Sequence, residues 1–173
     1  MKKIVLLLTG IIIISNAIWS YVYFKEINKA SNSGIQVYNL NGTGEIWDVI
    51  NYKIIVSPTK IQRGNGRLVY KGDSKNIENS TYYKYEIKEI NIDDKYGTVF
   101  VNEASSKGGP VSILSNLNDT GSIIGEFSYD ELKKDKQNYE STTITITWND
   151  NEGRLHSETV NLDIDSEIVL NDE

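Results

Sequence analysis

The chain opens with an uncharged, predominantly apolar run at residues 4–24, with Lys2 and Lys3 before it and Lys25 after it. A helix rises about 1.5 Å per residue, so this run would span roughly 30 Å, the thickness of a bilayer's hydrocarbon core. The pattern predicts a single transmembrane helix. The two lysines before the run favour a cytoplasmic N-terminus and an extracellular C-terminal domain.

The same run is also compatible with a secretion signal, because small residues, Ser15 and Ala17, occupy the two positions that a signal peptidase reads. Cleavage after Ala17 would release a secreted chain. That chain would begin with IWSYVYF and expose large apolar side chains to water. Retention would instead place Trp19, Tyr21 and Tyr23 at the outer membrane interface. Residues 1–24 are therefore interpreted as a signal anchor, with a cleaved signal peptide as the alternative.

After a small, polar segment at residues 25–34, which predicts a flexible stalk, the apolar positions recur every second residue. In residues 45–57 the even positions are apolar apart from Asp48, which predicts one long strand or two strands joined by a bulge. In residues 82–90 tyrosine and isoleucine alternate with lysine and glutamate, as in a half-buried strand. Further strands are predicted at residues 67–71, 98–101, 111–114, 123–127, 143–148 and 154–164.

One helix is predicted in the soluble part, from about residue 129 to about residue 138. Ser128 and Glu131 have the spacing of a capping box, and Phe127 with Leu132 that of the flanking hydrophobic staple. Farther on, the apolar face of residues 154–164 changes parity, which predicts a bulge near residues 156–159.

Many short strands with one connecting helix indicate a mainly β protein. The expected architecture is an N-terminal transmembrane helix followed by an antiparallel β-sandwich, immunoglobulin-like or related, over residues 35–166. Residues 167–173 form a predicted acidic tail.

Composition removes several classes of chemistry. The chain has no cysteine, which excludes disulfides, thiol nucleophiles and cysteine-bound zinc. Its one histidine, His156, has no second histidine for a relay or a multi-histidine metal site. Beyond residue 24 there are 16 basic and 24 acidic residues, a net charge of −8, which disfavours nucleic acid as a partner. We expect no cofactor, no metal and no catalytic residue, although acidic clusters leave a carboxylate-dependent hydrolase open as an alternative.

Two features are candidates for binding. Basic residues gather at Lys60, Arg63, Arg67 and Lys71 in an otherwise acidic domain, and such a group could contact an anionic envelope component. Trp47 lies off the cleaner apolar face of its strand, which makes it the best candidate for an exposed aromatic side chain at a contact with a protein.

The whole chain resembles a group of small, uncharacterised, membrane-anchored proteins of Gram-positive bacteria. The resemblance rests on the MKK start, the anchor ending NAIWSYVYF, the segments NYKIIVSP and RGNGRLVYKGD, and ITITWNDNEG before an acidic end. It implies an anchor and one outer domain, and it carries over no functional residue. The function predicted is a non-enzymatic, membrane-anchored, extracytoplasmic β-sandwich that binds a partner at the cell envelope. The alternatives are an envelope hydrolase and a secreted binding protein or inhibitor.

Overall fold

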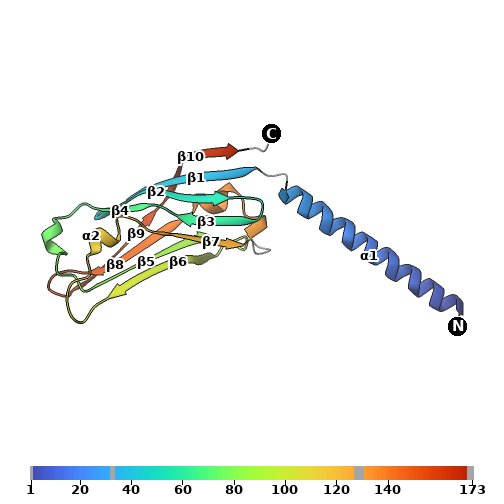
Figure 1. The fold of residues 1–173 in the computed structure, drawn as a ribbon, viewed down its shortest axis with the longest axis horizontal. Coiled ribbons are helices and arrows are strands. Elements are labelled where there is room, and N and C mark those ends of the chain that lie inside the picture. Colours follow the sequence, from blue (N-terminus) through green and yellow to red (C-terminus); the bar gives the residue numbers. More distant parts are fainter. Residues whose placement is uncertain (1, 32–33, 127–130, 171–173) are drawn as a thin grey trace.

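A computed structural model describes residues 2–31, 34–126 and 131–170, and within the first helix the side chains of residues 8–25. That helix, α1 (Lys2–Ser31), projects from a body of β-strands (Figure 1). It continues through residues 25–31, so most of the predicted flexible stalk is helical. Between Lys25 and Ser31 the chain contains no glycine or proline that would break a helix.

The side chains of α1 that the structure describes do not pack against the β-strands. Its large apolar residues from Leu8 to Phe24 are exposed. Within the described residues, however, no helix combines the length and the apolar character needed to cross a membrane. The predicted span begins at residue 4, and the side chains of residues 4–7 lie outside the described part. A helix therefore forms where a transmembrane helix was predicted, but the span itself is not confirmed.

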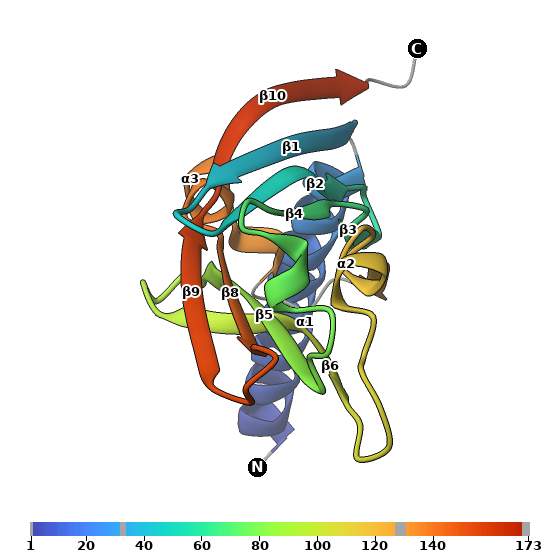
Figure 2. The ribbon, with the colours of Figure 1, turned by 90° about the vertical axis from the view of Figure 1, so that its left-hand side faces the viewer.

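The strands form two antiparallel sheets that pack face to face, which confirms the mainly β prediction. One sheet has the order β10-β1-β2-β3-β7, with β4 also paired to β2, and the other has the order β6-β5-β8-β9. Figure 2 shows β10 and β1 side by side at one edge of the first sheet. The strands are β1 (Ile35–Thr43), β2 (Trp47–Val56), β3 (Lys60–Gly64), β4 (Arg67–Tyr70), β5 (Tyr82–Ile90), β6 (Tyr96–Ser105), β7 (Ser122–Glu126), β8 (Thr143–Asn149), β9 (Leu155–Asn161) and β10 (Asp163–Leu170).

The core lies between the sheets and is built from alternate residues of the central strands. Tyr52 and Ile54 of β2 face Tyr85 and Ile87 of β5, together with inward side chains of β8. Alternation works here because successive side chains of a strand point to opposite faces. The half-buried strand predicted at residues 82–90 is thus confirmed.

A bulge in β2 explains why Trp47 is buried rather than exposed, contrary to prediction. The register between β1 and β2 shifts between Leu40 and Gly42, and Asn51 opposite this point has a φ of 57°. The extra residue changes which face points inward. Before the bulge the inward residues are therefore the odd ones, Trp47 and Val49, and Trp47 packs edge-on against Trp148 with 5.7 Å between ring centroids.

The C-terminal strand crosses from one sheet to the other. β9 pairs with β8 with no register shift, so the bulge predicted near residues 156–159 is wrong. The chain instead leaves the second sheet at the buried Leu162 and enters the first as β10, paired with β1. Leu155, the residue that suggested a change of parity, is exposed, and the inward residues of β9 are the even ones up to the buried Leu162. Residues 167–170 of the predicted acidic tail belong to β10.

Short helical segments connect the strands. The predicted helix at residues 129–138 is replaced, over its described part, by a 3₁₀ turn, η2 (Glu131–Lys133), and a separate helix, α3 (Lys136–Glu140). Asp135 caps α3, accepting hydrogen bonds from its first backbone N–H groups, and so starts a new helix there. Residues 127–130, which carry half of the predicted capping signal, lie outside the described residues. A strand was predicted at residues 111–114, but the chain forms the short helix α2 (Ile113–Asn116) there. A further 3₁₀ turn, η1 (Ser74–Asn76), precedes β5.

Candidate functional site

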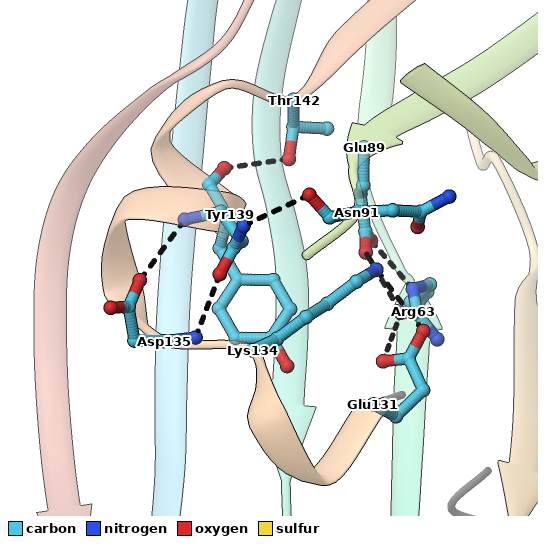
Figure 3. Close-up of polar contacts among 9 residues, drawn as sticks. Arg63, Glu89, Asn91, Glu131, Lys134, Asp135, Tyr139 and Thr142 are labelled. Carbon is cyan, nitrogen blue, oxygen red and sulfur yellow. Dashed lines mark hydrogen bonds and ion pairs between the residues drawn. The ribbon is translucent and has the colours of Figure 1, made fainter. Parts of the chain in front are cut away.

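Four charged side chains form a closed ring between the two sheets, which we call the buried ring: Arg63, Glu89, Glu131 and Lys134 (Figure 3). Arg63 binds Glu89 through two parallel contacts, Nε to Oε1 at 2.5 Å and Nη2 to Oε2 at 2.8 Å. Its Nη2 also lies 2.9 Å from Glu131 Oε2. Lys134 closes the ring, with Nζ 3.0 Å from Glu89 Oε2 and 3.1 Å from Glu131 Oε1.

Three separate elements supply the buried ring. Arg63 follows Ile61 on the inward face of β3, and Glu89 follows Ile87 on the inward face of β5. Each is thus a charge at a core position of a different sheet. Glu131 and Lys134 are three residues apart, so one turn of η2 brings both side chains to the same place. The ring therefore ties both sheets and the η2 segment together.

The opposite charges compensate for burial. Loss of water around Arg63 would by itself lower the pKa of its guanidinium group, but the hydrogen bonds and charge of Glu89, with a contribution from Glu131, raise the pKa above its ordinary value. Burial raises the pKa of Tyr139, which packs beside the ring, and the nearby carboxylates raise it further. The four charges of the ring sum to zero, so the cluster places no net charge in the core.

The buried ring brings two carboxylates together, which is the arrangement that a carboxylate-dependent hydrolase needs. Its geometry does not suit that chemistry. Glu89 is fully buried, and both of its oxygens already accept hydrogen bonds from Arg63. A depression of about 290 Å³ is lined by the end of β5, the β5–β6 turn and the η2–α3 segment, and none of the four ring residues lines it. Among the described residues, Glu89 is closed off from solvent and held by Arg63 and Lys134, so the ring links the elements that supply it.

A second charged cluster, the hairpin cluster, lies at the β8–β9 turn and consists of Asp150, Arg154 and His156. Asp150 Oδ2 lies 2.8 Å from Arg154 Nε and 2.9 Å from His156 Nε2. These hydrogen bonds, that of His156 first, lower the pKa of Asp150 below its usual range. The His156 ring stacks on Trp148 with 5.5 Å between centroids. The lone histidine thus helps to hold the turn.

Glu158 of β9 holds the loop between β1 and β2 in place. Its carboxylate accepts hydrogen bonds from the backbone N–H groups of Glu45, Ile46 and Trp47, the last at 2.8 Å. Lys71 lies at the same loop, where its Nζ is 3.0 Å from Asp48 Oδ1 and donates to the carbonyl of Gly44. These contacts fix the backbone just before the buried Trp47.

The residues predicted for binding do not form one surface. Trp47 and Arg63 are buried, whereas Lys60, Arg67 and Lys71 are exposed. Lys60 precedes Ile61, which pairs with Val56 at the last residue of β2. Lys71 follows Tyr70, which pairs with Trp47 at the first residue of β2. At about 3.3 Å per residue these ends are about 30 Å apart. The basic residues are thus dispersed, and one of the four is neutralised in the core.

The sequence contained one signal for the buried ring, a charged residue on the apolar face of a strand. The alternation of residues alone did not show what that residue contacts. Glu89 continues the series Tyr83, Tyr85 and Ile87 on the apolar face of its strand, and a charged residue in such a series indicates a buried partner of opposite sign. The identity of that partner was not visible, because it comes from a distant part of the chain.

Comparison with known proteins found no match: no protein-family model, no curated protein and no solved structure is similar to this chain. The resemblance to membrane-anchored proteins of Gram-positive bacteria therefore stays a prediction from the sequence.

Proposed function

We propose that the protein is a non-enzymatic binding module of the cell envelope, with α1 as a membrane anchor and the β-sandwich outside the cytoplasm. One observation carries the proposal. The apolar side chains of α1 from Leu8 to Phe24 are exposed, and α1 presents them on all sides. A surface of this kind is costly in water and is covered when it lies in lipid. The uncharged run that begins at residue 4 adds to the apolar length.

The flanking residues support an orientation for the anchor. Lys2 and Lys3 precede the run and favour a cytoplasmic N-terminus. Trp19, Tyr21 and Tyr23 are exposed in the last part of the apolar run, nearer to the β-sandwich along the chain. Aromatic side chains at this position suit the outer interface of a bilayer. We also propose that the β-sandwich has the immunoglobulin-like or related topology that the sequence suggests.

The proposed partner is an envelope protein or an anionic envelope component. Lys60, Arg67 and Lys71 remain candidates for such a contact because their side chains reach solvent. Trp47 and Arg63 are withdrawn, since neither can contact a partner without opening the core. Their roles are in packing and in the buried ring.

The proposal is tested with the full chain, tagged at its C-terminus, in wall-stripped bacterial cells. We expect the chain in the membrane fraction, resistant to carbonate extraction, with the tag removed by protease added outside. A cytoplasmic protein in the same cells serves as the control for lysis. A tag that resists protease on intact cells but not on lysed cells would place the domain inside and refute the proposed topology.

A secreted protein is the second candidate, because Ser15 and Ala17 match the small residues that precede a signal-peptidase cut. In that case α1 would be lost in large part and the β-sandwich would diffuse away. The intact mass of the mature chain separates the two: a chain that begins at residue 18 supports secretion, and a chain that retains residues 1–17 supports the anchor.

A further inference from the structure

A cluster of exposed apolar side chains lies where β1 begins and β10 ends; we call it the apolar edge. It consists of Ile35, Ile168, Val169 and Leu170, each between about one third and just over one half exposed. Ile35 pairs with Leu170 across the two strands, and Gln36 pairs with Val169. Among the strands that the structure describes, β10 lies at the edge of its sheet and pairs with β1. The apolar edge therefore combines bare apolar side chains with an unpaired strand edge, a combination that soluble surfaces usually avoid.

The apolar edge lies at the end of the sandwich from which α1 leaves. Figure 1 shows the start of β1 and the end of β10 on the side that faces α1. Four Cα-to-Cα steps lead from Ser31, the last residue of α1, to Ile35, the first of β1. At 3.8 Å per step the two residues are at most about 15 Å apart. The chain itself thus limits how far the apolar edge can be from α1.

The length of α1 sets the height of the apolar edge above a membrane. If the apolar run ends at Phe24, the helix rises about 10 Å from there to Ser31, at about 1.5 Å per residue. The interfacial layer of a bilayer extends roughly 5–8 Å beyond its hydrocarbon core on each side. The end of α1 therefore stands close to the headgroups, and the short connection allows the apolar edge to reach them.

We infer that the apolar edge inserts into the interfacial layer of the lipid membrane that holds α1, so that the β-sandwich rests on the membrane. This inference rests on the proposed anchor. The insertion is shallow, because the unpaired backbone groups of β10 need water, which the hydrocarbon core does not supply. β10 carries Asp163, Asp165 and Glu167, and Lys136 pairs with Glu167 at 2.9 Å. The attraction is thus apolar and needs no anionic lipid.

The geometry favours lipid over a second copy of the chain. Two β10 strands paired antiparallel would turn the second sandwich end for end. The two α1 helices would then leave from opposite ends and could not enter one bilayer. A membrane surface requires no such reversal, since α1 and the apolar edge lie on the same side.

The test uses the absence of cysteine in the chain, which allows single-cysteine labelling of the full-length protein. A polarity-sensitive fluorophore is attached to V169C in the apolar edge, to L155C as the matched control, and to I12C in α1. Leu155 is also an exposed apolar strand residue, and it follows the β8–β9 turn, at the end of the sandwich away from α1 (Figure 1). Each protein is reconstituted into phosphatidylcholine vesicles with and without a spin-labelled lipid that quenches the fluorophore.

We expect the probe at residue 169 to shift to shorter wavelength and to be quenched several-fold more than the probe at residue 155. If residue 169 behaves like residue 155 while residue 12 is quenched, the inference is wrong and the anchor stands. If residue 12 is not quenched, the anchor fails, and the inference fails with it. A shift at residue 169 that grows with protein density and shows no quenching would indicate a second copy at the apolar edge, which also overturns the inference.

Discussion

The buried ring and the hairpin cluster use the same ion-pair chemistry in two different environments. Contacts from Arg63 to Glu89 and from Arg154 to Asp150 have similar lengths, 2.5–2.8 Å and 2.8 Å. The side chains of Glu89 and Lys134 are 0% and 1% exposed, whereas Arg154 and His156, the partners of the buried Asp150, are 71% and 40% exposed. A buried charge that loses its partner has no water to replace it, and an exposed one does. Burial rather than contact length therefore decides how much each cluster matters to the fold.

The largest effect is expected from E89Q, which removes the charge that neutralises Arg63 and Lys134 in the core. We expect a loss of about 3–5 kcal/mol in the free energy of unfolding, because two buried cations lose their shared carboxylate. Urea unfolding followed by near-ultraviolet circular dichroism measures it. The matched control is E86Q on the outward face of the same strand, with an expected change of about 0–1 kcal/mol. Equal losses in the two variants would contradict the comparison.

Replacing the whole buried ring is expected to be far milder than breaking it. In the variant R63M/E89L/E131L/K134M every buried charge is removed together, so no partner is left without compensation. Such replacements are often neutral or stabilise a fold by about 1–4 kcal/mol, because the cost of burying charges disappears. The same urea experiment measures the difference from E89Q. A quadruple variant as unstable as E89Q would show that the ring gives a net attraction of its own.

The hairpin cluster is expected to make a smaller contribution that depends on pH. The hydrogen bonds of His156 and Arg154 lower the pKa of Asp150 in the folded chain. A carboxyl group of this kind stabilises the fold above its unfolded-state pKa of about 3.9, and the contribution is lost as the pH falls toward the folded-state pKa. The difference in stability between the natural chain and D150N should thus shrink as the pH falls below about 4. Thermal unfolding at a series of pH values measures it.

The control for this experiment is D93N. Asp93 forms an ion pair with Lys95 on an exposed turn, at 2.9 Å. We expect a smaller difference for D93N than for D150N at neutral pH, because one exposed ion pair contributes less than a carboxylate with several donors. A D150N difference that does not shrink below about pH 4 would refute the role assigned to Asp150.

The smallest effect is expected from salt, and it separates the two clusters directly. Raising the ionic strength from 0.1 M to 1 M shortens the screening length from about 10 Å to about 3 Å, which weakens exposed ion pairs most. The destabilisation caused by D150N should therefore decrease in 1 M sodium chloride, and that caused by E89Q should change little. Urea unfolding at the two salt concentrations provides the measurement. An equal salt dependence in both variants would mean that water reaches the ring.

Much of the fold could be predicted because its signals are local. The alternation in residues 82–90 places Tyr83, Tyr85 and Ile87 in the core, since a strand alternates its faces whatever its neighbours are. The strands at residues 143–148 and 154–164 were predicted for the same reason. The helix at residues 129–138 was predicted as one element, but the hydrogen bonds that Asp135 accepts start a new helix inside it.

The candidate site could not be predicted, because it depends on residues that are distant in sequence. Arg63 was interpreted as part of a basic surface and Trp47 as an exposed aromatic residue. The pairing of β3 with one sheet and β5 with the other turns Arg63 toward Glu89, and the bulge at Asn51 turns Trp47 inward. A one-residue bulge reverses the face of every residue on one side of it, and alternation alone does not locate it.

By itself the sequence determined that an apolar N-terminal helix precedes a cysteine-free, mainly β domain, because length, charge and periodicity are local properties of the chain. Only the tertiary structure decided the strand order, the change of sheet at Leu162 and the closure of the buried ring. These depend on contacts between elements far apart in sequence, and a charged residue on a strand has the same local pattern whether it faces water or a partner of opposite sign.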